Sequence, residues 1–190
     1  MSILSRNNPR RMAVQRMTRT SVMLAAALAL SLLESVLPPL PAPVPLRYGL
    51  ANVAVMAALL FIGPFEAVSV ALLKSVFVLM TRGLIAGSIS FTGTLLSVGV
   101  MVGADFLLKR RTSVFLLSVL GAIAHNAGQL FFLVLFLQYK LSVLFIGPYL
   151  LFFGVLTGLL SGALLFICLR PLEAFFRASD RSGGKDSGMM

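Results

Sequence analysis

Long apolar segments that carry almost no charge are the feature that most constrains this chain. Six such segments cover residues 20–37, 49–63, 65–81, 90–108, 113–137 and 143–169. A helix needs about 20 apolar residues to cross the bilayer, with a range of about 17–25. The second and third segments are short, but Gly63-Pro64 separates them and favours two helices joined by a tight turn. The pattern predicts an all-α integral membrane protein with six transmembrane helices.

The overall composition excludes a soluble domain. Hydrophobic residues make up 58% of the chain and charged residues 12%, whereas soluble domains are about half apolar and about a quarter charged. The net charge of +10 does not indicate nucleic-acid binding, because the basic residues flank apolar segments and form no soluble basic face. The single Cys168 excludes an internal disulfide, and no Cys/His cluster suggests zinc. We expect no metal and no cofactor.

The distribution of Lys and Arg predicts the topology. One side of the six segments carries Arg6, Arg10, Arg11, Arg16, Arg19, Lys109, Arg110, Arg111, Arg170, Arg177, Arg181 and Lys185. The other side carries only Arg47, Arg82 and Lys140. The positive-inside rule makes the richer side, which holds both termini, cytoplasmic. We therefore expect a multi-pass protein of a prokaryotic plasma membrane, with a basic cytoplasmic segment (1–19), a six-helix membrane domain (20–170) and a disordered cytoplasmic tail (171–190).

A cleaved signal peptide is the alternative interpretation of the first segment. It has a basic start, an apolar run and the small residues "ALA". The run, however, continues through Val36, which exceeds the usual apolar region of a signal peptide, about 7–15 residues. A retained first helix is favoured.

Polar residues inside the apolar segments indicate a site. Ionisable groups at membrane depth are expensive, and they usually mark pathways or binding sites. At a rise of 1.5 Å per residue, most of these groups fall in the outer half of the membrane. They are Glu34, Asn52, Lys74, Arg82, His125, Asn126 and Gln129. Asp105 falls instead near the inner end of its segment, where pairing with the Lys-Arg-Arg loop is expected. The asymmetry predicts capture of a molecule from outside.

Each of these groups also has a purely structural interpretation. His125, Asn126 and Gln129 lie in "GAIAHNAGQ", and such side chains often bond across helices in membranes. Lys74 either pairs with Glu34 or, like Arg82, meets an anionic cargo. A catalytic role for His125 is not expected, because the sequence offers it no second histidine and no obvious carboxylate partner.

Three further patterns have alternative interpretations. Residues 38–48, "PPLPAPVPLRY", are either a stiff linker or a loop that closes over the site. "LFIGPF" at 60–65 recurs as "LFIGPY" at 144–149, a placement that a three-plus-three inverted repeat would produce. Small residues at spacing four permit close helix approach. They are Ser21, Ala25 and Ala29 in the first segment, and Gly154, Gly158 and Gly162 in the sixth, where packing within the bundle is favoured.

Three stretches resemble a known family. "RYGLANV" at 47–53, "GSISFTGTLLS" at 87–97 and "GAIAHNAGQ" at 121–129 are similar to the heptaprenyl diphosphate synthase component I family, also called Gx transporters. The resemblance covers roughly residues 20–170. That family in turn resembles the substrate-binding S components of energy-coupling factor (ECF) transporters, which are ABC importers.

The resemblance implies a function. S components have six helices, cytoplasmic termini, an outward-facing site under the loop between helices 1 and 2, and an alanine motif that meets the coupling subunit. Ala25 and Ala29 match that motif. The implied protein is not an enzyme. It binds a small cofactor-related or isoprenoid/quinone-related cargo, together with a transmembrane coupling subunit and two ABC ATPases.

The family name suggests the alternative function. That alternative is a non-transporting membrane subunit associated with a prenyl diphosphate synthase or with a flavin-linked electron-transfer system. Prenyl synthases hold diphosphate through magnesium on paired aspartates. The chain has only Asp105, Asp180 and Asp186 and no Asp-rich motif, so the residues do not match synthase chemistry.

Overall fold

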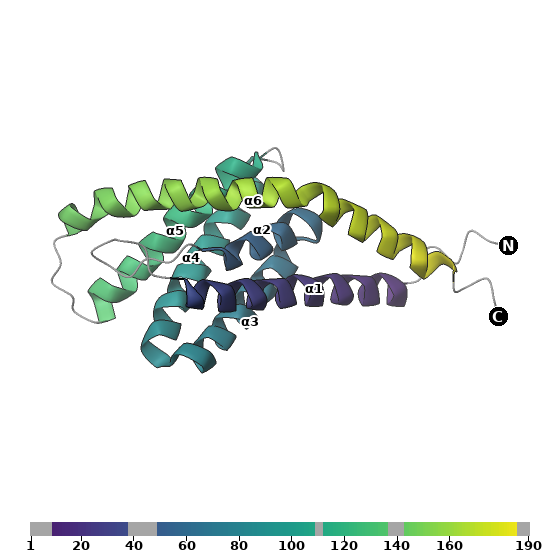
Figure 1. The fold of residues 1–190 in the computed structure, drawn as a ribbon, viewed down its shortest axis with the longest axis horizontal. Coiled ribbons are helices and arrows are strands. Elements are labelled where there is room, and N and C mark those ends of the chain that lie inside the picture. Colours follow the sequence, from purple (N-terminus) through teal and green to yellow (C-terminus); the bar gives the residue numbers. More distant parts are fainter. Residues whose placement is uncertain (1–8, 38–48, 109–111, 137–142, 186–190) are drawn as a thin grey trace.

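The computed structural model describes residues 9–37, 49–108, 112–136 and 143–185. This part of the chain is all-helical, as the sequence predicted (Figure 1). The helices are α1 (Pro9–Val36), α2 (Ala51–Phe61), α3 (Pro64–Arg82), α4 (Leu84–Leu107), α5 (Val114–Phe136) and α6 (Val143–Lys185). Residues 38–48, interpreted above as a linker or a lid, and the Lys-Arg-Arg loop at 109–111 lie outside the described residues.

Five helices are long and apolar enough to cross a membrane, and the chain is a multi-pass membrane protein. The remaining helix, α2, has 11 residues. At 1.5 Å per residue it extends about 16 Å, well short of the roughly 30 Å hydrocarbon core. Of the six predicted spans, α2 is therefore the one that cannot cross the membrane by itself.

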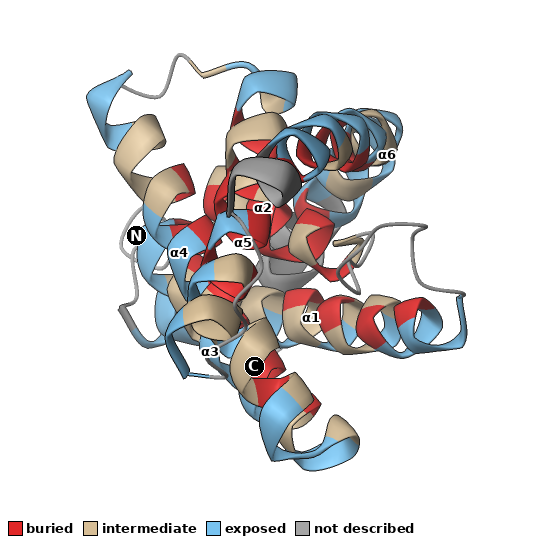
Figure 2. Ribbon diagram, turned by 90° about the vertical axis from the view of Figure 1, so that its left-hand side faces the viewer, coloured by how far each residue is buried: buried red, intermediate tan, exposed pale blue. Residues whose placement is uncertain are grey.

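Helix α2 occupies the centre of the bundle. It contacts each of the other five helices, and its residues from Ala51 to Leu59 are buried except for Asn52. Buried residues of the surrounding helices face the interior of the bundle, whereas exposed residues lie outside (Figure 2). An apolar helix that is enclosed on all sides shows no amphipathic pattern. The core therefore forms around the shortest helix.

Two glycines make the turns on either side of α3. Gly63 has φ +155° and precedes Pro64. Pro64 occupies the first helical position, where a backbone N–H would have no partner within the helix. Gly83 has φ +83° and is the single residue between α3 and α4. Helix α4 consequently begins at Leu84, six residues before the predicted segment. Thr92 Oγ1 donates to the carbonyl oxygens of Ser88 and Ile89 in the preceding turn, so its hydroxyl is satisfied within α4.

The two copies of the repeated hexapeptide have different structures. The first copy ends α2 and forms the turn at Gly63. The second copy lies within the first turns of α6, which runs on through Pro148. The local structure therefore provides no support for an inverted repeat.

Close glycine contacts join α4, α5 and α6. A Cβ atom at Gly128 on α5 would lie 2.9 Å from Gly93 Cα on α4. A Cβ atom at Gly158 on α6 would lie 2.6 Å from Val119 Cα, and Ser118 Oγ donates to the Gly158 carbonyl at 2.7 Å. Gly154 and Gly162 also face α5. The glycine ladder of α6 packs within the bundle, as predicted.

Helix α6 continues beyond the predicted end of the membrane domain. The tail from residue 171 was expected to be disordered, but α6 is helical to Lys185 and includes Pro171. Phe176 is buried, its ring centroid lies 5.6 Å from that of Phe61, and the Arg19 guanidinium lies 5.0 Å above it. Phe176 thus contacts α1 and α2 beyond residue 170, the predicted end of the membrane domain.

Candidate functional site

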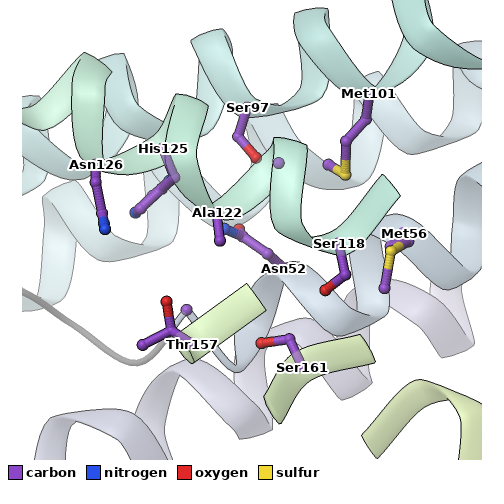
Figure 3. Close-up of a pocket in the computed structure, with 12 residues that line it drawn as sticks. Asn52, Met56, Ser97, Met101, Ser118, Ala122, His125, Asn126, Thr157 and Ser161 are labelled. Carbon is purple, nitrogen blue, oxygen red and sulfur yellow. The ribbon is translucent and has the colours of Figure 1, made fainter. Parts of the chain in front are cut away.

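Polar side chains from four helices surround a small cavity inside the bundle (Figure 3). Its volume is about 20 Å³, roughly the space of one water molecule. The lining residues are Gly49, Asn52, Met56, Ser97, Met101, Ser118, Gly121, Ala122, His125, Asn126, Thr157 and Ser161. Most of them are small or polar, in a protein whose helices are otherwise apolar. This cavity is the candidate functional site.

Helix α5 contributes the polar cluster that the sequence singled out. His125 and Asn126 line the cavity, and Gln129 lies one turn further on. All three are buried. Gln129 Nε2 lies 3.1 Å from His125 Nε2. This contact joins the two side chains across one turn of α5. Asn126 Nδ2 makes a long contact of 3.5 Å with the Leu150 carbonyl oxygen on α6.

A second network lies behind the cavity at the start of α2. Lys74 Nζ on α3 donates to Asn52 Oδ1 at 2.8 Å. Glu34 at the end of α1 accepts from the Gly49 backbone N–H at 2.5 Å. Gly49 has φ +71°, a left-handed conformation that suits glycine. Lys74 and Glu34 are both buried and lie close enough for their charges to interact.

The structure gives Lys74 a hydrogen-bond partner that the sequence did not suggest. The sequence left open a direct ion pair with Glu34 or contact with an anionic cargo. In the structure Lys74 instead holds Asn52, a residue of the cavity wall, while Glu34 holds Gly49, another. Opposite charges thus hold two cavity residues in place, Gly49 just before α2 and Asn52 in its first turn. Arg82, at the end of α3, lies apart from the cavity lining and donates to the Ser31 carbonyl oxygen on α1.

Three buried polar atoms in this region have no hydrogen-bond partner. They are Thr94 Oγ1, Ser97 Oγ and His125 Nδ1. Their residues are at most 6% exposed. A buried polar group without a partner is unfavourable by about 1–3 kcal/mol, and native structures satisfy nearly all such groups. Ser97 and His125 line the cavity, so an occupant of the cavity is the natural partner for these atoms.

Only some of the predicted site residues line the cavity. Asn52, His125 and Asn126 reach the cavity, while Glu34, Lys74 and Gln129 support it from behind and Arg82 lies further away. Sequence reasoning missed the hydroxyl groups and the two methionines of the lining. These residues are Ser97, Ser118, Thr157, Ser161, Met56 and Met101. The sequence did offer one signal for these residues: Thr157 and Ser161 are four residues apart, so they lie on one face of the helix beside the glycine ladder.

An ion pair that the sequence analysis overlooked lies near the other end of α3. Glu66 in the first turn of α3 lies 3.7 Å from Arg16 of α1. A carboxylate near a helix N-terminus is favourable because of the helix dipole. Arg16 is largely exposed, so the pair is screened and contributes little to stability. It joins the basic N-terminal segment to the turn at Gly63.

Metal ligands do not gather in the described part of the chain. Among those residues, no three His, Cys, Asp or Glu side chains lie close enough to hold a metal ion. The acidic residues whose side chains the structure describes lie on four separate helices, at Glu34, Glu66, Asp105 and Glu173. The cavity itself offers hydroxyl, amide and imidazole groups.

One face of α1 is exposed and smooth. Ser21, Ala25 and Ala29 are exposed, whereas Met23 and Ala27 are buried against the bundle. Beside this face runs an apolar groove between α1 and α6, floored by α2, with a volume of about 480 Å³. On α1 it is lined by Val22, Met23, Ala26 and Leu30. A transmembrane helix of another protein can approach closely over such small residues.

Comparison with known proteins gives one match. The family model of heptaprenyl diphosphate synthase component I matches residues 23–167, which include α2 to α5 and most of the apolar parts of α1 and α6. Neither the curated proteins nor the solved structures contain a significant match to the chain.

Proposed function

The chain belongs to the heptaprenyl diphosphate synthase component I family, and from that premise we propose that it is the substrate-binding membrane subunit of an ECF-type ABC importer. In this proposal it resides in a prokaryotic plasma membrane and captures a small cofactor-related or isoprenoid/quinone-related molecule from outside. It performs no catalysis itself.

The buried polar cavity is the observation that supports this proposal. Ser97 Oγ and His125 Nδ1 face it without partners, and opposite charges brace its wall at Gly49 and Asn52. A membrane anchor needs only an apolar surface and gains nothing from buried groups that lack partners. A binding subunit needs such groups, because the cargo satisfies them.

The energy for transport comes from other subunits in this proposal. A transmembrane coupling subunit docks on the Ala25/Ala29 face of α1, and two cytoplasmic ABC ATPases hydrolyse ATP. Close docking over alanines lets the coupling subunit reorient the whole small bundle. The apolar groove beside α1 offers additional surface for the same partner.

Native mass spectrometry of the protein, purified in mild detergent from its source cells, tests the binding function. We expect a co-purified small molecule that is lost in Asn126→Ala and in Gln129→Ala, because both side chains shape the cavity. Gln15→Ala on α1, outside the cavity lining, is the matched control and keeps the molecule. A chain that carries no small molecule and brings down a soluble prenyl synthase would overturn the proposal.

Bulky substitutions on α1 test the coupling surface. Ala25→Leu/Ala29→Leu is expected to reduce recovery of the coupling subunit at least tenfold while cargo binding persists, because the added side chains hold the partner helix away. Ala127→Leu, at an exposed position on α5, adds the same volume elsewhere and should leave the assembly intact. Co-purification with quantitative blotting measures the outcome. Equal recovery of the coupling subunit with both variants would show that it does not dock on this face.

The family's description, heptaprenyl diphosphate synthase component I, supports one alternative function. A component of heptaprenyl diphosphate synthase would act with a soluble prenyl synthase, and its polar cavity would only join helices. Synthase activity of a purified partner, measured with and without this chain in detergent, distinguishes the two functions. Activity that depends on the chain and survives Asn126→Ala favours the alternative.

A further inference from the structure

We infer that the cavity selects a compact, uncharged polar compound, and that it rejects phosphorylated and prenylated molecules. The inference rests on the proposed function, since it names the class of molecule that the binding site takes. It narrows the cargo well beyond what the family resemblance implies, and it separates the cargo from the diphosphate in the family's description.

The lining of the cavity carries no formal charge among the described residues. Its polar groups are the amides of Asn52 and Asn126, the His125 imidazole and four hydroxyls, at Ser97, Ser118, Thr157 and Ser161. A diphosphate site uses Lys, Arg, a metal ion or several backbone N–H groups at a helix N-terminus. The cavity wall has none of the charged groups, and most of its residues lie inside helices, where backbone N–H groups are already bonded.

The nearest cations are directed elsewhere. Lys74 Nζ donates to the side-chain oxygen of Asn52 and is not part of the cavity lining. The charge of Glu34 acts on Lys74 and opposes it. The Arg82 guanidinium contacts the Ser31 carbonyl oxygen on α1. An anionic cargo would therefore gain little from these cations and would lose its hydration, which strongly disfavours binding.

The unpartnered atoms define what the cargo must supply. Ser97 Oγ is buried without a hydrogen-bond partner, so the cargo supplies a donor or an acceptor there, because a hydroxyl does both. His125 Nδ1 is also buried without a partner, and it donates or accepts according to the tautomer of the ring. An uncharged compound with hydroxyl, amide or carbonyl groups satisfies both positions.

Two methionines of the cavity wall limit the shape of the molecule that can bind. Met56 and Met101 face the cavity from α2 and α4, and Met101 packs on Gly121, where a Cβ atom would lie 2.8 Å from its Sδ (Figure 3). Methionine side chains are flexible and fill the space around a group of irregular shape. The cavity of about 20 Å³ between them admits a compact group. A prenyl chain has no matching apolar channel in this lining.

The test is affinity selection on the intact protein in detergent. A metabolite extract of the source cells is separated into molecules that pass both anion- and cation-exchange resins and molecules that either resin retains. Geranyl diphosphate and inorganic pyrophosphate are added as separate anionic probes. Ligands recovered with the protein are identified by mass spectrometry. We expect enrichment from the uncharged pool and none of either probe.

A matched pair of serine variants links the ligand to the cavity. Ser97→Ala removes an unpartnered hydroxyl from the wall and should weaken binding of the selected compound about tenfold, the effect of one hydrogen bond. Ser75→Ala removes an equally buried hydroxyl that already bonds the Ala71 carbonyl oxygen of its own helix, outside the cavity lining. Its binding should stay unchanged.

The outcomes distinguish the selectivity for uncharged compounds from the binding function on which it rests. A charged compound, or geranyl diphosphate, that binds and is lost in Ser97→Ala would overturn the selectivity while supporting a binding subunit. No enrichment from any pool would overturn the binding function itself. Equal loss in both serine variants would place the ligand outside this cavity and overturn the assignment of the site.

Discussion

Gly128→Ala is expected to separate α4 from α5 and to destabilise the bundle by about 3 kcal/mol, at the upper end of overpacking effects. The added Cβ atom would lie 2.7 Å from the Thr92 carbonyl oxygen and 2.9 Å from Gly93 Cα. Both atoms belong to the backbone of α4 and cannot rotate aside as a side chain can. Circular dichroism melts in detergent, with size-exclusion profiles, measure the loss.

The control for this substitution lies on the neighbouring helix. At Gly99 on α4 an added Cβ atom would meet nothing within 4 Å. Gly99→Ala should therefore change stability by no more than about 0.5 kcal/mol, with a small gain from the higher helix propensity of alanine. Similar melting temperatures for Gly128→Ala and Gly99→Ala would show that α4 and α5 are not in close contact in the membrane protein.

Lys74→Met is expected to give the second large effect, a loss of about 3 kcal/mol, typical of removing one member of a buried charge pair. The substitution keeps the length and apolar stem of the side chain. It removes the hydrogen bond to Asn52 and leaves the buried Glu34 carboxylate without its opposing charge. Thermal unfolding of the single variant against the parent chain measures the effect.

A double variant tests the origin of that loss. Glu34→Gln in the Lys74→Met background removes the uncompensated charge while retaining an acceptor for the Gly49 backbone N–H. The double variant should recover more than half of the lost stability, and the resulting cycle measures the coupling between the two residues. Simple addition of the two single effects would show that the charges do not interact across the start of α2.

The helical segments were predictable because apolar segments and a Gly-Pro turn can be recognised from neighbouring residues in the sequence. The early start of α4 was not, because the turn between α3 and α4 takes only one residue, Gly83. The second segment was already seen to be short, but its enclosure by all five other helices depends on the packing of the whole bundle. The helical tail depends on contacts of Phe176 with Phe61 and Arg19, which come from distant parts of the chain.

The site was predictable to a similar degree. His125, Asn126 and Asn52 attract attention because amides and imidazoles are rare in apolar helices, and all three line the cavity. Serine and threonine do not stand out in the same way, because their hydroxyls commonly bond the preceding turn, as Thr157 does to Phe153. Only the three-dimensional arrangement distinguishes Ser97, whose hydroxyl has no such bond. The partner of Lys74 likewise depends on the packing of α2 against α3.

The short central helix has a consequence for the proposed binding site. A molecule held beside Asn52, at the start of α2, is separated from the far end of that helix by about 16 Å, roughly half the thickness of the hydrocarbon core. The residues from Val53 to Leu59 between these two points are all apolar and buried. In the proposed importer, this column of apolar side chains would insulate the bound cargo from the far end of α2.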